Sequence, residues 1–328
     1  MGAAASLEAT VKTMPTIIAV AALLLALGAG RSAVADETGA PATARERGIA
    51  GVVVQGLGGT ADYAAEFADA AGVVADALVS LDPAGEAVER LDESAGREAI
   101  LAAIERQGAR DAGTFVLVLI GHGSVDGDSW KFNVAGPDPD GDDLIGALAT
   151  VRAPRQLVVL GASASGALLE TLAQPGRVVV TATKSGGEIN AVRFPGFLAE
   201  ALDSASADVD RNEILTVAEA FRFADARTRE YYEEADLLAS EHPRLLGDEA
   251  MSLPLARLGS LRLAGDDPAV LALLDTRLEL ERRYRELLSR KADLPTDDYY
   301  AELETLMLSI AGLQRAIDRA SGWSEDDA

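Results

Sequence analysis

Two apolar runs, each ending in a turn of small residues that carries a reactive group, constrain this chain most. The first run, residues 115–120, leads into a Gly-His-Gly turn that contains His122. The second run, residues 157–160, leads into a Gly-Ala-Ser turn that contains Ser163. Apolar runs of this length bounded by glycine are typical of buried strands in a parallel sheet. Because the carboxyl ends of such strands open on one crevice, the two residues form a candidate base and nucleophile.

The rest of the domain alternates apolar segments with amphipathic ones. The pattern predicts further strands over residues 49–57, 74–81 and 177–182, and helices over residues 61–71, 95–107, 194–202 and 217–235. Strands that alternate with helices predict a three-layer α/β/α sandwich with a mainly parallel sheet, and we assign residues 50–265 to it.

The N-terminus has the pattern of a signal peptide over residues 1–35. Lys12 precedes an eleven-residue apolar run, and a small-x-small site ends at Ala35. Such a run is shorter than the ~20 residues that span a bilayer, which disfavours a membrane anchor. We therefore expect an exported protein, periplasmic or secreted, with cleavage near Ala35 and a linker over residues 36–49.

Composition narrows the possible partners. The chain of 328 residues has a net charge of −24 and no cysteine. Nucleic acids and anionic membranes need a basic footprint, so we expect neither as a partner of the mature protein. Without cysteine the fold has no disulfide, and its stability must come from packing.

A helical hairpin is predicted over residues 266–319, followed by an acidic tail over residues 320–328. Thr296 is the predicted N-cap of the second helix. Apolar residues there follow a heptad seam, namely Tyr299, Leu303, Leu306, Ile310, Leu313 and Ile317. A two-helix hairpin leaves part of such a seam open, so we expect it to pack on its own domain or on a second subunit.

The two turn motifs resemble those of the caspase-like cysteine peptidases, most closely their legumain-type branch. In that branch one strand ends in His-Gly and a later one in Ala-Cys-x-Ser-Gly. Residues 162–166 read Ala-Ser-Ala-Ser-Gly, so Ser163 stands in the position of the cysteine. The resemblance implies a peptide-bond hydrolase with His122 as the base and Gly123 in the oxyanion hole.

Ser163 leaves two functions open. A hydroxyl is far less acidic than a thiol and needs a strongly oriented base, usually held by a carboxylate. Asp126 and Asp128 follow His122 closely, but nothing in the sequence assigns them that role. We expect a homologue inactive as a cysteine peptidase that binds peptides or proteins; the alternative is an active Ser–His hydrolase.

The resemblance also implies a loop for the substrate's P1 side chain after the next strand. Lys184, Ser185 and Glu188 lie there, and we group them with Gly161 as candidate substrate-binding residues. A solvated loop is the alternative. Ser165 is expected to be an N-cap, and His242, outside both motifs, to be structural.

One segment matches a calcium loop of the EF-hand type. Candidate ligands occupy its positions 1, 3, 5, 7, 9 and 12, namely Asp208, Asp210, Asn212, Ile214, Thr216 and Glu219. Glu213 replaces the usual glycine at position 6, which should weaken binding. An acidic helix N-terminus without metal is the alternative. Calcium is the one candidate cofactor, and we expect no organic cofactor.

The segment between the two motifs is rich in aspartate. Six aspartates lie among residues 126–143, together with Trp130 and Phe132. Two interpretations remain open: a substrate wall or cation site, and an acidic surface loop.

Overall fold

The computed structural model describes residues 48–81, 88–127, 129–264 and 267–322, all within one compact unit. The predicted signal peptide lies outside these residues, as do linker residues 36–47 and tail residues 323–328. Among the described residues, no helix combines the length and the hydrophobicity that a membrane crossing requires.

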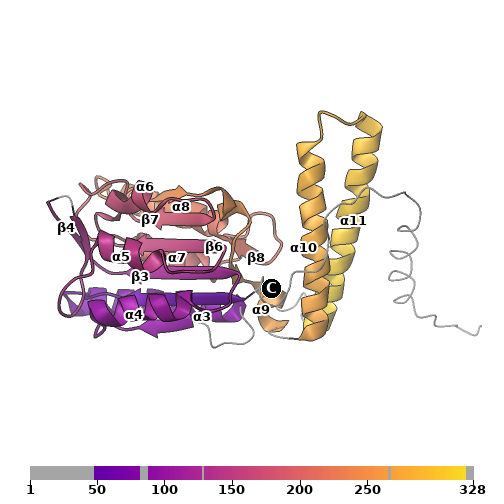
Figure 1. Ribbon diagram of the computed structural model, residues 1–328. Helices are drawn as coiled ribbons and strands as arrows, with labels where there is room; N and C mark the ends of the chain where they lie inside the picture. Colours follow the sequence, from indigo (N-terminus) through magenta and orange to yellow (C-terminus); the bar gives the residue numbers. More distant parts are fainter. Residues whose placement is uncertain (1–47, 82–87, 128, 265–266, 323–328) are drawn as a thin grey trace, which may run out of the picture. The chain divides into compact units, whose positions relative to one another are not determined.

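A six-stranded sheet forms the centre of the fold, in the order β2-β1-β3-β6-β7-β9. Its strands are β1 (Ile49–Gln55), β2 (Val88–Leu91), β3 (Thr114–Ile120), β6 (Arg155–Gly161), β7 (Arg177–Thr181) and β9 (Arg244–Leu246). Figure 1 shows the strands β3, β6 and β7 of this sheet. All neighbours are parallel except β9, which runs antiparallel to β7. The predicted mainly parallel sheet is confirmed.

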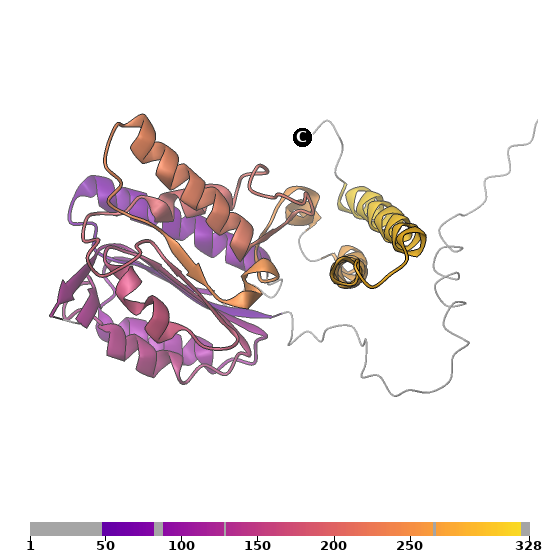
Figure 2. The same ribbon diagram turned by 90° about the horizontal axis from the view of Figure 1, so that it is seen from above.

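Helices cover both faces of this sheet (Figure 2). One face packs against α3 (Ala61–Leu81), α7 (Phe194–Ala201) and α8 (Val217–Glu234); the other packs against α4 (Arg97–Gly108), α5 (Gly141–Leu148) and α6 (Leu169–Leu172). Successive residues of a strand point to opposite faces, so Val116 and Val118 join the first core while Leu117 and Leu119 join the second. The three-layer sandwich is therefore confirmed.

The predicted strand over residues 74–81 is wrong. Helix α3 continues through it to Leu81, because Phe67, Val74 and Leu78 extend one buried helical stripe. The strand beside β1 is instead β2, whose sequence Val-Glu-Arg-Leu is only partly buried. An edge strand of this kind lacks the apolar signal of a central one.

The aspartate-rich segment contains the antiparallel hairpin β4 (Gly123–Asp126) and β5 (Ser129–Phe132). Trp130 and Phe132 are buried in the core, so they do not form a substrate wall.

A second short pair joins β8 (Ile214–Thr216) to β10 (Pro254–Arg257). Three single-turn or two-turn pieces complete the domain, namely η1 (Ser165–Leu168), η2 (Asp248–Met251) and α9 (Gly259–Ala264).

The C-terminal hairpin consists of α10 (Pro268–Ser289) and α11 (Thr296–Ser321). Thr296 is the first helical residue and Pro295 the N-cap, so the predicted cap is wrong by one position. Much of the seam is closed by α10, where Leu287 packs with Tyr299 and Leu306. At the other end of the hairpin, Ile317 joins a cluster with the domain residues Ile214 and Leu261, and with Val270 and Leu274 of α10.

Candidate active site

Strand register brings the two turn motifs together. Ile120, the last residue of β3, pairs with Gly161, the last residue of β6. His122 and Ser163 each lie two residues beyond this pair. The N–H of Gly121 donates to the carbonyl of Gly161 at 3.2 Å and extends the ladder into the turns. The backbones of both motifs therefore meet at one edge of the sheet, as the sequence predicts.

The imidazole of His122 is held from the β1 side. Its Nε2 lies 3.1 Å from the carbonyl oxygen of Gly58, so in the neutral ring Nε2 carries the proton and donates it there. Tyr63 and Phe67 of α3 contact the ring edge-to-face, each with centroids 5.1 Å apart. A backbone carbonyl and two aromatic rings thus orient the base, and Nδ1 remains as the proton acceptor.

Asp126 does not act as the orienting carboxylate of His122. Asp126 pairs with Lys131 at 3.0 Å and its side chain is 80% exposed. Asp128 lies outside the described residues. The sequence does not predict the contact with the carbonyl of Gly58, because every residue type has a main-chain carbonyl.

Ser163 is buried, with 2% of its surface exposed. Its Oγ makes no hydrogen bond within the described part of the chain, to His122 or to any other group. Its carbonyl oxygen accepts from the indole Nε1 of Trp130 at 2.9 Å. Strand register therefore brings the two turns to one edge of the sheet, but no hydrogen bond joins the Ser163 hydroxyl to the imidazole of His122 in the described structure.

Gly123 is the second glycine of the Gly-His-Gly turn. The N–H of Phe132, its register partner, donates to Pro139 at 3.0 Å, so the two residues form a non-hydrogen-bonded pair. The Gly123 N–H points away from β5, and no backbone acceptor among the described residues receives it. A free, partly exposed N–H at this edge has the character of an oxyanion donor.

The turn after Ser163 is bound to the loop that follows β7. Ala164 has the left-handed φ of 57°, which is unusual for a residue with a Cβ, and its N–H donates to the carbonyl of Glu188 at 2.7 Å. The Ser165 hydroxyl accepts from the N–H of Ala182 at 3.1 Å. Ser165 is therefore not an N-cap, because its side chain joins β6 to β7.

The predicted substrate loop places Lys184, Ser185 and Glu188 next to this turn. The main chain at Gly166 leaves no room for a Cβ against residues 183–185. Lys184 and Ser185 are exposed, and the Ser185 hydroxyl accepts from Gly187. Gly161 is buried, with its carbonyl already bonded to Gly121.

Glu188 forms a cluster with His242 that the sequence does not predict. The Nδ1 of His242 lies 2.5 Å from Glu188 Oε1, while the Nζ of Lys184 lies 3.2 Å from the same oxygen. Nδ1 also lies 3.3 Å from the Nζ of Lys184. It donates its hydrogen bond to the carboxylate of Glu188, which is closer and can only accept. Burial favours the neutral form of Glu188, yet the bonds from Lys184 and His242 outweigh it and lower the pKa of Glu188.

The residue before His242 explains how it reaches this loop. Glu241 is buried and accepts from the N–H groups of Arg193 and Phe194, at the start of α7, and from the hydroxyl of Tyr232. Burial raises the pKa of Glu241 above its ordinary value, although these bonds oppose the shift. Because these bonds hold Glu241 in the core, the next residue, His242, lies against Glu188 in the loop after β7. The expected structural role of His242 agrees with this geometry.

The candidate calcium loop gathers three carboxylates. Asp208, Asp210 and Glu219 offer oxygens that all lie within 4.8 Å of one another. Glu213, at position 6, has a φ of 62°, the left-handed conformation for which such loops use glycine. Asp210 is exposed at the surface, yet partial desolvation within the loop, followed by the charges of Glu219 and Asp208, raises its pKa to about 6.

The same loop also satisfies its polar groups without a metal. Asp208 accepts from the N–H groups of Asn212 and Glu213, and Asn212 accepts from that of Ile214. Glu219 and Thr216 form a reciprocal capping box at the start of α8. Both alternatives from the sequence, a calcium loop and an acidic helix N-terminus, fit these contacts.

Comparison with known proteins identifies no family for the chain. No family model matches its sequence, and no curated protein matches it. Among solved structures, it is similar to caspase-1 from the insect Spodoptera frugiperda, with 13% identity and a TM-score of 0.43 over 70% of this chain and 98% of that one. It is also similar to the Drosophila initiator caspase Dronc, with 9% identity and a TM-score of 0.44 over 67% and 85%. At these values the likeness assigns no activity to the chain.

Proposed function

We propose that this protein is an exported, caspase-like homologue of the legumain-type peptidases that binds peptides or proteins without cleaving them. The observation that carries the proposal is the pairing of Ile120 with Gly161, which sets His122 and Ser163 at matching positions beyond two neighbouring strands. Two motifs of one catalytic family, brought to one sheet edge by register, are what a descendant of such a peptidase retains.

The state of Ser163 supports loss of turnover. The residue is almost fully buried, and no hydrogen bond joins it to His122 among the described residues. The base is oriented by Gly58 instead of a carboxylate. A serine in this position keeps the shape of the turn, but its hydroxyl lacks the base contact that would make it a nucleophile.

An active Ser–His hydrolase is the second candidate, and one observation favours it. His122 and Gly123 are partly exposed, and the Gly123 N–H is free of backbone acceptors in the described structure. A base and an oxyanion donor therefore remain in place. Hydrolysis would require a movement of the turn that carries Ser163, to bring its Oγ to hydrogen-bond distance, about 2.6–3.2 Å, from the base.

Labelling with a fluorophosphonate probe separates the two candidates. A binding protein gives no label above that of the Ser163→Ala variant. The buried Ser165 serves as a matched control, because Ser165→Ala removes a hydroxyl from the same turn without touching the candidate nucleophile. Label that disappears with Ser163→Ala and persists with Ser165→Ala would replace the binding function with the hydrolase.

Within the bound peptide, we assign the P1 side chain to the loop of Lys184, Ser185 and Glu188. Glu188 is occupied by His242 and Lys184, and the Lys184 side chain is 46% exposed. The exposed ammonium of Lys184 therefore favours an acidic or amide side chain. Gly161 contributes only by allowing close packing, because its carbonyl is used within the sheet.

We also propose that the loop over residues 208–219 binds calcium. The ligands would be the side chains of Asp208, Asp210, Asn212, Thr216 and Glu219, with the carbonyl of Ile214. The support is the positive φ of Glu213 at the position where the motif needs a sharp turn, together with three converging carboxylates. Calcium would replace the contacts that Glu219 makes in its capping box. A calcium titration followed by calorimetry, with Glu219→Gln as control, tests the site.

A further inference from the structure

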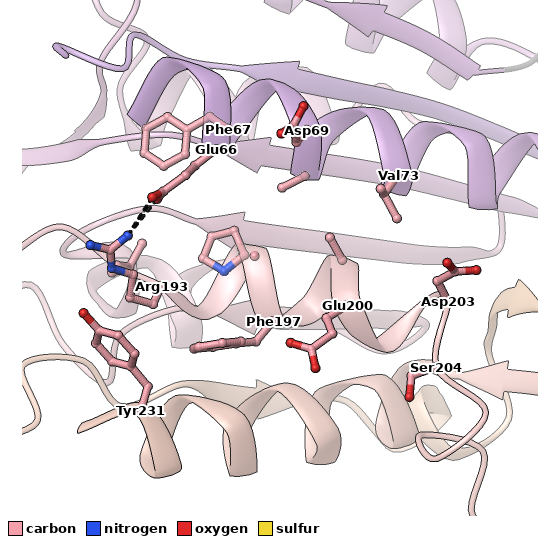
Figure 3. Close-up of a pocket in the computed structure, with 15 residues that line it drawn as sticks. Glu66, Phe67, Asp69, Val73, Arg193, Phe197, Glu200, Asp203, Ser204 and Tyr231 are labelled. Atoms are coloured by element: carbon pink, nitrogen blue, oxygen red, sulfur yellow. Dashed lines mark hydrogen bonds and ion pairs between the residues drawn. The ribbon is translucent and has the colours of Figure 1, made fainter. Parts of the chain in front are cut away.

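A groove separate from the candidate active site runs between α3 and the α7–α8 face. It has a volume of about 770 Å³, within the range of ligand sites in proteins. Figure 3 shows its two walls, with Glu66, Asp69 and Val73 from α3 on one side and Phe197 and Glu200 from α7 on the other. Its lining residues on α3 run from Glu66 to Val73, seven residue steps or about 10 Å along the helix axis. That length suits about three residues of an extended peptide.

The groove has an apolar interior and an acidic rim. Val73, which is 39% exposed, and the partly exposed Phe197 supply most of the accessible apolar surface, and the buried Phe67 and Pro195 lie beneath it. Carboxylates surround it, namely Glu66, Asp69, Glu200 and Asp203. Asp69 has no hydrogen-bond or ion-pair partner among the described residues, so its charge is available to a ligand. An apolar surface bordered by carboxylates complements an apolar side chain flanked by cations.

Among the described residues, Arg193 is the one cation that lines the groove, and it is already fixed. Arg193 pairs with Glu66 at 2.7 Å and lies over the ring of Tyr231, with its guanidinium carbon 5.7 Å from the ring centroid (Figure 3). The same carbon lies 5.4 Å from the ring centroid of Tyr63.

Two further arginines pair with carboxylates of the rim. Arg227 pairs with Glu200 through its buried Nε and lies over the ring of Phe197, with its guanidinium carbon 5.6 Å from the ring centroid. Arg262 pairs with Asp203 through an exposed contact, which contributes little and can be exchanged for a contact with a ligand. With Asp69 unpaired among the described residues and Asp203 open to exchange, the groove keeps an acidic character towards a partner.

We propose that this groove docks a peptide segment of a partner protein that carries a large apolar side chain flanked by arginine or lysine. The net charge of −24 strengthens the preference, because it repels acidic segments and attracts basic ones. This is a second site, and its assignment does not depend on the proposed peptide cleft at Ser163. The two sites share a wall, since Phe67 lines the groove and also contacts the ring of His122.

Two glycines allow a test with a matched control. Gly196 of α7 lines the groove, and a Cβ there would meet nothing within 4 Å. Gly146 of α5 lies on the opposite helical layer and has the same open space. A tryptophan at position 196 fills the groove without disturbing the core, and a tryptophan at position 146 places the same ring on an unrelated surface.

The experiment measures fluorescence anisotropy of a labelled peptide that alternates leucine with arginine. We expect binding that weakens at least tenfold in Gly196→Trp and is unchanged in Gly146→Trp. Val73→Lys should weaken it and Val79→Lys should not, since the two valines are equally exposed on α3 but only Val73 lines the groove. A peptide that alternates glycine with arginine should bind at least tenfold less tightly.

Three results would overturn the proposal. Equal affinity for the glycine and leucine peptides would reduce binding to charge attraction alone. Equal affinity of the two tryptophan variants would move binding to another surface. A dimer in sedimentation that Gly196→Trp dissociates would assign the groove to a second copy of this chain.

Discussion

The backbone of Gly123 packs directly against the carbonyl oxygen of Ser163, and a Cβ at position 123 would overlap that oxygen. The same Cβ would stand 2.8 Å from the indole Nε1 of Trp130, which donates to this carbonyl. Both neighbours are buried, so neither can move aside without disturbing the core. The glycine is therefore required by packing as well as by the proposed oxyanion role.

This contact predicts that Gly123→Ala destabilises the protein by about 1–3 kcal/mol, the usual range for overpacking. Gly146→Ala is the control, because a Cβ there meets nothing and alanine favours the helix by up to about 1 kcal/mol. Urea denaturation of both variants measures the difference. Equal stability of Gly123→Ala and the parent would contradict the contact between the two turns.

The second prediction is that Ser163→Cys creates a reactive thiol. A thiol ionises far more readily than a hydroxyl, so it needs less help from His122 to become a nucleophile. We expect alkylation by iodoacetamide and slow cleavage of peptide substrates, both reduced by adding His122→Ala.

Ser165→Cys provides the control for Ser163→Cys. It introduces a thiol into the same turn, at a fully buried position that bonds to the N–H of Ala182. This thiol should stay unreactive in the folded protein. A Ser163→Cys variant that resists both reagents and substrates would show that the cleft no longer supports the chemistry.

The sequence predicts the sheet well because its central strands are buried on both faces. Residues 115–120 and 157–160 are apolar throughout, and a continuous apolar run of this length has few other structures to adopt. The edge strand β2 is missed for the opposite reason, since its glutamate and arginine are tolerated where one side faces solvent. Helix α3 is cut short in the prediction because Gly72 and the β-branched Val73 and Val74 have low helix propensity and resemble the start of a strand.

The sequence predicts those parts of the candidate site that depend on the type of residue at a position, and not the contacts that orient these residues. Register brings His122 and Ser163 to one edge, as parallel strands require. The orientation of His122 depends on the Gly58 carbonyl, and the Glu188–His242 pair joins residues 54 positions apart through the antiparallel strand β9. Contacts of this kind follow from tertiary packing, which no local pattern encodes.

A third prediction concerns pH and Asp210. Its pKa of about 6 lies above the unfolded value of about 3.9, so ionising it costs more in the folded protein than in the unfolded chain. The stability that protonated Asp210 contributes to the folded protein is fully present below about pH 3.9 and is lost as pH rises through about 6. Asp210→Asn should therefore raise the melting temperature of the metal-free protein at pH 8 and change it little at pH 4. The same increase at both pH values would exclude a titrating carboxylate as the cause.

A fourth prediction is that calcium raises the melting temperature. An ion that binds only the folded state stabilises it by mass action, by about 2.7 kcal/mol at a concentration 100 times its Kd. Glu219→Gln should abolish the increase. Asp142→Asn removes a carboxylate from the start of another helix, α5, and should not. The affinity should also fall below pH 6, because calcium must displace the proton of Asp210. An unchanged melting temperature in millimolar calcium would leave the loop as a capped helix start.

The last prediction concerns the base of the hairpin, where Leu274 and Ile317 pack with Ile214 of the domain. Leu274→Ala should cost about 2–5 kcal/mol, the usual range for a buried leucine. Leu288→Ala is the control, because Leu288 lies on the same helix and is 43% exposed.

Deleting residues 266–328 tests the same contact from the domain side. The deletion exposes Ile214 and removes the bond from Arg277 to the carbonyl of Asn212, so the truncated domain should melt at a lower temperature than the monomeric parent. Light scattering of the parent decides the second possibility. A dimeric parent whose truncated domain is an undamaged monomer would show that the hairpin serves a second subunit, because a face buried between chains stabilises the assembly and not the domain.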